Sequence, residues 1–143
     1  MVWVEERRRF KRYEICCPAQ YRYYYHGPKN HSLTINMSEG GALISTTHLI
    51  DVATNILVKF FLRDEDFSIQ ARVVHFQIKT KDGAYHLGIE FLDRSRNFVF
   101  NFYEELELIA LYQRQYIEEM GRAISLSEAS IKWYCNSRDW LSS

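Results

Sequence analysis

A chain of 143 residues is long enough for one domain with an appendage, and 47% of its residues are hydrophobic, which excludes a protein disordered throughout. Lysine and arginine number 18, as do aspartate and glutamate, so the formal net charge is zero. A neutral chain does not favour a surface that is, as a whole, a footprint for nucleic acid or an anionic membrane.

The N-terminal residues 1–12 carry charges directly after the first four positions, with no apolar run behind them. This order is not that of a signal peptide, and no later apolar stretch approaches the roughly 20 residues of a membrane helix. Cys16 and Cys17 are adjacent and Cys135 has no obvious partner, so the cysteines do not form a disulfide framework. We expect a cytoplasmic protein with no membrane span.

The first two-thirds of the chain alternates β-branched and aromatic segments with turn signals. Strands are expected at residues 15–25, 32–35, 42–46, 55–62, 68–78 and 85–91. The turns between them are expected at residues 26–29, 36–41 and 63–66 and at Asp82-Gly83. Six short strands at close spacing predict a mainly β fold, a small antiparallel β-barrel or sandwich, rather than βαβ units.

From Asn97 onward the apolar period changes to that of a helix. The stripe at steps of three and four residues consists of Val99, Phe102, Leu106, Ile109, Tyr116 and Met120, with Gln113 as its polar member. This pattern predicts a long helix that ends at Gly121, followed by a shorter helix that begins at Ser127 with Glu128 in its first turn. The expected organisation is a β domain over residues 1–96 and a helical extension over residues 97–143.

Two arrangements of the long helix remain open. Its stripe can pack on the β domain, or it can join two copies of the chain through residues 97–121 into a homodimer or higher oligomer, although three heptads are marginal for that purpose. Glu104, Glu105 and Glu107 are expected on the polar face of this helix, where they would make that face acidic. An acidic face near the basic N-terminal segment could hold that segment.

Two short motifs are the candidates for ligand chemistry. The first is Arg8-x-x-x-Arg12, and the second is Asn36-x-Ser38-x-x-Gly41. A guanidinium group meets phosphate oxygens or the edge of guanine with two parallel donors. Amide and hydroxyl side chains can contact a base edge or a phosphate, and glycine permits close approach of the backbone or a positive φ. Each motif taken alone is weak, since basic runs and glycine-containing turns are common.

In this order and at this spacing, the two motifs resemble the paired signature of PilZ domains, and Gly88-Ile89-Glu90-Phe91 is similar to the closing strand of that family. The resemblance covers residues 5–93. It implies a six-stranded antiparallel β-barrel and a receptor for cyclic di-GMP that passes the signal to an unidentified protein partner. By resemblance, the ligand-binding residues are Arg8, Arg12, Asn36, Ser38 and Gly41, with Gly40 and Arg7 beside them.

Other functions were weighed against this one. A PilZ fold that binds no nucleotide and acts as a protein-interaction module is the main alternative. Binding of single-stranded nucleic acid would use the basic segment with Tyr21, Tyr23 and Tyr25 as stacking residues, but the neutral charge argues against nucleic acid as a partner. The five histidines show no metal-ligand spacing, and no base can be placed beside a cysteine nucleophile. We therefore expect no enzyme activity, cofactor or metal.

Overall fold

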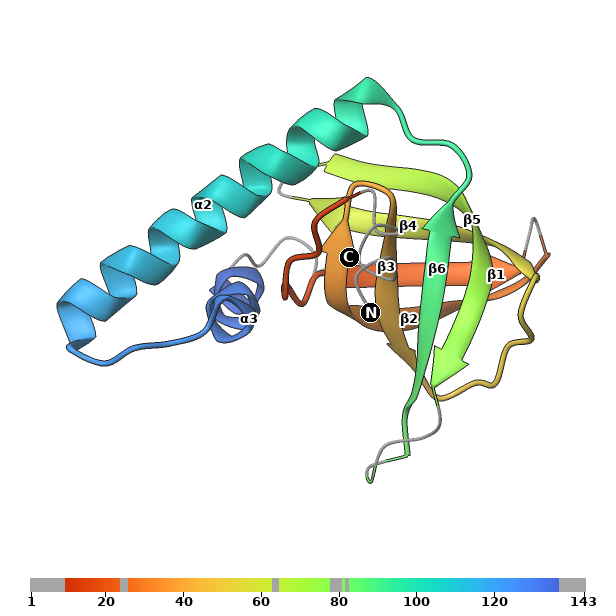
Figure 1. Cartoon of the computed structure of the whole chain (residues 1–143), viewed down its shortest axis with the longest axis horizontal. Coiled ribbons are helices and arrows are strands. Elements are labelled where there is room, and N and C mark those ends of the chain that lie inside the picture. Colours follow the sequence, from red (N-terminus) through yellow and green to blue (C-terminus); the bar gives the residue numbers. More distant parts are fainter. Residues whose placement is uncertain (1–9, 24–25, 63–64, 78–80, 82, 137–143) are drawn as a thin grey trace, which may run out of the picture.

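The described part of the chain forms six strands and two helices (Figure 1). The computed structural model describes residues 10–23, 26–62, 65–77, 81 and 83–136. The strands are β1 (Pro18–Tyr23), β2 (His26–Ser38), β3 (Gly41–Thr46), β4 (Asn55–Leu62), β5 (Glu65–Gln77) and β6 (Tyr85–Phe91), and the helices are α2 (Arg96–Met120) and α3 (Leu126–Asn136). All strand pairs are antiparallel, and they close a barrel in the order β1-β2-β3-β6-β5-β4.

Alternation of side chains fills the barrel. In β4 every second residue from Ile56 to Leu62 is buried and the residues between are half-buried or exposed, and β5 alternates in the same way from Phe67 to Val73. Because successive side chains of a strand point to opposite faces, each strand supplies one apolar row to the interior. The predicted six-stranded antiparallel barrel with helices after it is confirmed.

The observed strand boundaries agree with the prediction for two strands and differ from it at the start of β2. The bounds of β4 and β6 agree with the prediction, but the turn expected at residues 26–29 is wrong. His26 already pairs with Tyr23, and β2 runs on from there through Ser38. Gly27 has a φ of 79° and Pro28 cannot donate a hydrogen bond, and both lie in an irregular stretch that the strand tolerates.

An aromatic cluster closes one end of the barrel beneath α2. Ser95 caps this helix by accepting a hydrogen bond from the Phe98 N–H at 3.0 Å, which points the first turn at the barrel. The Phe98 ring then lies 5.6 Å from Phe91 and 6.1 Å from Phe60, measured between ring centroids. Phe102 stacks on it from the next turn at 6.2 Å. The start of α2 is therefore part of the barrel core.

The second half of α2 extends beyond the barrel, and α3 folds back between it and the barrel (Figure 1). Gly121 ends α2 in the left-handed conformation, with φ of 69° and its N–H bonded to the carbonyl of Ile117, as predicted. α3 begins one residue earlier than expected. Ser125, rather than Ser127, caps it by accepting from the Glu128 N–H at 3.0 Å. Within the described residues, neither helix combines the length and apolar character needed to cross a membrane.

The apolar stripe of α2 belongs to this chain's own core. Phe102, Leu106 and Ile109 are buried, and Tyr116 packs against the core, whereas Met120 at the far end is 62% exposed. The structure thus shows the first of the two arrangements, with the stripe packed on the barrel and on α3. The joining of two copies through residues 97–121 stays a prediction.

The prediction that Glu105 lies on an exposed acidic face of the long helix is wrong. Glu105 is fully buried. Its charge adds to the effect of burial in raising the pKa of Tyr134 in α3 and of Cys17 ahead of β1. Cys16 reaches the same helix, because its N–H donates to the Ser130 hydroxyl at 2.8 Å. Helical period alone placed Glu105 on the polar side, but α3 covers that side of α2 and buries it. The junction of α2, α3 and the segment before β1 therefore contains a buried polar group.

We predict that Phe98→Ala lowers the free energy of unfolding by about 3–5 kcal/mol, because a fully buried aromatic ring leaves a cavity in the core. Urea denaturation followed by circular dichroism measures this change. Phe100→Ala is the matched control, since Phe100 lies in the same helical turn and is 64% exposed. Equal losses in the two variants would contradict the packing of α2 on the barrel.

The cysteines should react in order of exposure. Burial raises the pKa of Cys17 to about 12, so its thiol stays protonated at neutral pH and is shielded from reagent. Cys135 is exposed and Cys16 is half-buried. We expect an aromatic disulfide reagent at about pH 8 to label Cys135 first and Cys17 only after unfolding in guanidinium chloride. Cys135→Ser should remove the fast phase, and fast labelling of Cys17 in the folded protein would refute its burial.

Candidate functional site

The loop between β2 and β3 is a tight turn held by a serine. Ser38 pairs with Gly41 across the turn, and its Oγ accepts a hydrogen bond from the Gly40 N–H at 3.2 Å. The same hydroxyl donates to the Gly41 carbonyl at 3.4 Å. Serine favours such turns because its hydroxyl replaces a backbone group as hydrogen-bond partner. The loop therefore has a defined shape before any ligand arrives.

A short β-bridge brings the N-terminal segment to this loop. The Tyr13 N–H donates to the Met37 carbonyl at 2.8 Å, and the Met37 N–H donates back to the Tyr13 carbonyl at 2.9 Å. The Tyr13 ring also packs edge-on against Phe102 of α2, 6.2 Å between centroids. Since Tyr13 is fixed beside Met37, Arg12 is held next to Ser38.

These two segments form one wall of a cleft of about 770 Å³. Phe10 and Arg12 line it from the N-terminal segment, and Ser38, Gly40 and Gly41 line it from the turn. The Phe10 ring lies over Gly40, where an added Cβ would come within 2.5 Å of a ring carbon. A cleft of this size suits a ligand of nucleotide dimensions.

The rest of the cleft lining comes from β5, β6 and the loop that follows. It includes His75, Glu90 and Arg94, and the His75 ring covers Gly88, where an added Cβ would lie 2.5 Å from the ring. The glycine thus lets the imidazole lie close to the strand. The lining as a whole presents two guanidinium groups, those of Arg12 and Arg94, and the rings of Phe10 and His75.

Of the two reasons that the sequence offers for a glycine at position 41, close approach of the backbone applies and a positive φ does not. Neither Gly40 nor Gly41 has a positive φ; the positive values among described glycines belong to Gly27, Gly83 and Gly121. A Cβ on Gly41 would instead lie 2.3 Å from the carbonyl oxygen of Ile89 in the paired strand β6. Close approach of two strands, rather than turn conformation, excludes a side chain there.

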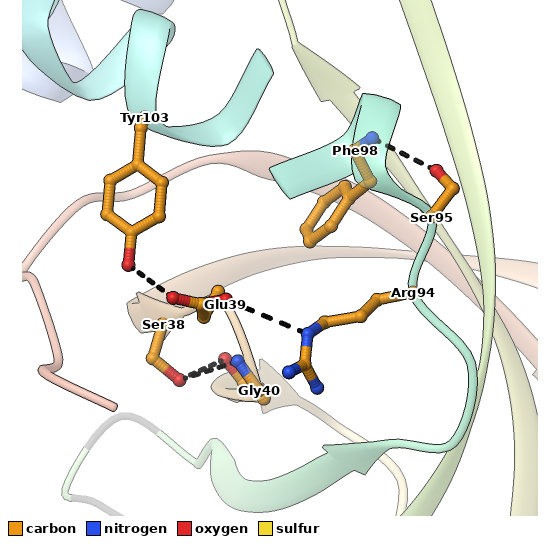
Figure 2. A network of polar contacts seen from close by, with 8 residues as sticks. Ser38, Glu39, Gly40, Arg94, Ser95, Phe98 and Tyr103 are labelled. Carbon is orange, nitrogen blue, oxygen red and sulfur yellow. Dashed lines mark hydrogen bonds and ion pairs between the residues drawn. The ribbon is translucent and has the colours of Figure 1, made fainter. Parts of the chain in front are cut away.

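A polar network joins the turn to both the cleft and α2 (Figure 2). The Tyr103 hydroxyl donates to Glu39 Oε1 at 2.7 Å, and Arg94 Nε lies 3.8 Å from Glu39 Oε2. The Arg94 guanidinium also lies 4.6 Å from the centroid of the Phe10 ring, a cation–π contact. Burial, together with the hydrogen bond to the Glu39 carboxylate, raises the pKa of Tyr103 to about 12.

The structure brings together four of the seven predicted site residues. Arg12, Ser38, Gly40 and Gly41 line the cleft, whereas Asn36 is half-buried in β2 and does not line it. Arg7 and Arg8 lie outside the described residues. The motifs gave no indication of His75 or Arg94, since these residues meet the loop only through the fold. Phe10 lies inside the arginine motif, at a position that the motif does not specify. The cysteine, histidine and acidic residues that the structure describes gather in no group suited to a metal ion.

The nucleic-acid alternative loses its stacking surface. Tyr21 is 2% exposed inside the barrel, where its hydroxyl pairs with Thr46 and lies 3.3 Å from His48 Nδ1. Tyr23 is 42% exposed, and Tyr25 lies outside the described residues. Tyr21 points into the barrel core while Tyr23 is partly exposed, so these two tyrosines do not form a common exposed stacking surface.

Comparison with known proteins agrees with this geometry. The family model of the PilZ domain matches residues 6–101. Among solved structures, the PilZ domain of YcgR from Escherichia coli with c-di-GMP matches with a TM-score of 0.57 at 14% identity, over 82% of this chain and 99% of that one. The MrkH–c-di-GMP complex from K. pneumonia matches with a TM-score of 0.59 at 17% identity, over 76% of this chain and 55% of that one.

The inhibitor of motility MotI/DgrA from Bacillus subtilis gives a TM-score of 0.57 at 14% identity, over 70% of this chain and 52% of that one. This chain therefore spans about half the length of the Bacillus and Klebsiella proteins. At such identities the likeness shows the barrel fold. No curated protein sequence matches this chain.

We predict that Gly41→Ala lowers the free energy of unfolding by about 2 kcal/mol or more, because the new methyl group must push β3 away from β6. Urea denaturation gives the value. Gly40→Ala is the adjacent control, since its methyl group meets the movable Phe10 ring, and it should cost less stability. A Gly41→Ala variant as stable as the parent would mean that the two strands are not this close.

Proposed function

We propose that this chain, which belongs to the PilZ domain family, is a receptor that binds cyclic di-GMP in the cleft between the N-terminal segment and the β2–β3 turn. The observation that carries the proposal is that one cleft is lined both by Arg12 of the arginine motif and by Ser38, Gly40 and Gly41 of the second motif. Two of the similar structures, the YcgR PilZ domain and MrkH, are described as containing c-di-GMP.

Each lining residue would have a specific part in binding. The exposed guanidinium of Arg12 would meet a phosphate or a guanine edge with paired donors. Ser38 and the backbone of Gly40 would contact the ligand from the turn. The His75 imidazole offers a flat face on which guanine can stack, while the Phe10 ring, packed between Gly40 and Arg94, would support the turn.

Arg8, Arg7 and Asn36 complete the proposed site. Arg8 lies two positions before Phe10, at most about 7 Å away along the chain, a distance that an arginine side chain can bridge to reach the cleft. Asn36 precedes the turn by two residues and would contact a base edge from its rim. The arginines are expected to dominate, since hydrogen bonds that involve a charge are worth more than neutral ones.

Closure of the N-terminal segment on the nucleotide would change the surface offered to a protein partner. Tyr13 directly follows Arg12 and touches both β2 and Phe102 of α2, so the segment and the helix share contacts. A ligand that binds one arrangement of the segment more tightly shifts the population toward it. The output would then be read from the segment and the adjacent part of the barrel.

We expect Arg12→Ala and Arg8→Ala each to weaken binding at least about 30-fold, equivalent to ~2 kcal/mol, because a charge-assisted paired contact is lost. Ser38→Ala and Asn36→Ala should each weaken it about five-fold, since a neutral hydrogen bond is worth ~1 kcal/mol. Isothermal titration calorimetry with cyclic di-GMP measures these affinities.

GMP and single-stranded DNA serve as ligand controls. Arg122→Ala is the protein control, because Arg122 is an exposed arginine in the turn between α2 and α3, outside the cleft. Absence of binding by the parent protein would contradict the receptor proposal and leave the nucleotide-free interaction module. Normal affinity in both arginine variants would contradict the site.

A further inference from the structure

Arg94 is an arginine of the cleft that neither sequence motif contains. It lies in the loop between β6 and α2 and lines the cleft, and 35% of its side chain is exposed. Its contacts use the flat face, over the Phe10 ring, and Nε, toward Glu39. The edge formed by its two terminal nitrogens makes no hydrogen bond with the part of the chain that the structure describes. That edge is the one that binds phosphate in pairs.

Glu39 is an unusual neighbour for a site that must accept two phosphates. Its carboxylate sits in the turn between Ser38 and Gly40, and 21% of the side chain is exposed. A negative charge in this place repels an anionic ligand, and partial burial reduces its screening by salt. Tyr103 and Arg94 are its partners among the described residues, and of these two Arg94 carries the opposite charge. In Figure 2 the side chains of Tyr103 and Arg94 converge on this carboxylate from α2 and from the loop after β6.

The geometry of the Arg94–Glu39 pair is that of a weak, exchangeable contact. The closest nitrogen and oxygen are 3.8 Å apart, beyond hydrogen-bond distance, whereas the Tyr103–Glu39 bond is 2.7 Å long. Partly exposed ion pairs of this kind contribute little stability. Arg94 can thus leave Glu39 at small cost, while Tyr103 keeps the carboxylate in place.

We propose that Arg94 is a further ligand-binding arginine, and that in the nucleotide-free protein Glu39 is its counter-ion, which a ligand phosphate displaces. This inference rests on the proposed function, because the displacing phosphate is that of cyclic di-GMP. The exchange transfers Arg94 from a single Nε contact to a paired contact. It also makes Glu39 an internal competitor that sets the affinity of the site.

The test is a double-mutant cycle with Glu39→Gln and Arg94→Ala, titrated calorimetrically with cyclic di-GMP. Glutamine retains an acceptor for the Tyr103 hydroxyl and removes the charge that competes for Arg94. We expect Glu39→Gln to tighten binding about three- to ten-fold and Arg94→Ala to weaken it about ten-fold or more. In the double variant the gain from Glu39→Gln should disappear, because the arginine it releases is absent.

Arg122→Ala is the matched control, since Arg122 has the same pair of contacts, an ion pair with Glu128 at 3.5 Å and a cation–π contact with Tyr116, far from the cleft. Its affinity should equal that of the parent. The midpoint temperature of thermal unfolding of Arg94→Ala should stay close to that of the parent protein. A loss of affinity in this variant would then not result from a loss of folded structure.

The outcomes separate the two proposals. If the parent binds and Arg94→Ala binds equally well, the role of Arg94 is refuted while the receptor function stands. If Glu39→Gln tightens binding equally with and without Arg94, Glu39 acts by direct repulsion and the counter-ion exchange is refuted. If the parent binds no cyclic di-GMP, the receptor function fails and this inference fails with it.

Discussion

Two backbone hydrogen bonds between Tyr13 and Met37 hold the N-terminal segment beside the β2–β3 turn, and the candidate site depends on this contact. They hold the residue after Arg12 against β2, one position before Ser38, and so convert a basic N-terminal run into the wall of a cleft. The Tyr13 ring packs against Phe102, so α2 contacts the chain at the same place. Without this bridge the arginine and the turn would be neighbours only by chance, since twenty-odd residues of chain separate them.

The parts of the fold that the sequence predicted well are those governed by local chemistry. β4 alternates without interruption, and Gly121 ends α2 where a left-handed residue is needed, so both could be placed from their own neighbours. β2 could not, because Gly27 and Pro28 have the character of turn residues and only pairing across the barrel keeps them in a strand. Glu105 was misplaced for a related reason, since helical period cannot reveal that α3 covers it.

The same division applies to the site. Arg12 and the Ser38–Gly41 turn carry a recognisable spacing, and the structure brings them together. Arg94 and His75 join them through contacts between elements far apart in the chain, which no spacing reports. Phe10 lies inside the arginine motif, but the spacing of the arginines does not reveal that its ring packs over Gly40. The zero net charge of the whole chain does not describe this region, because two arginines, Arg12 and Arg94, line the cleft and Glu39 pairs with one of them. A neutral total can conceal a local field suited to an anion.

The hydrogen bond from the Cys16 N–H to Ser130 joins residues 114 positions apart. During synthesis, this contact must wait until α3 has left the ribosome, because α3 is the last element that the structure describes. The barrel strands can pair earlier, but the segment just after Tyr13 gains this contact only after α3 has been made. A nascent chain interrupted within α2 would therefore lack the hydrogen bond that ties the segment before β1 to α3. The order of synthesis thus places the support of that segment after the pairing of the strands.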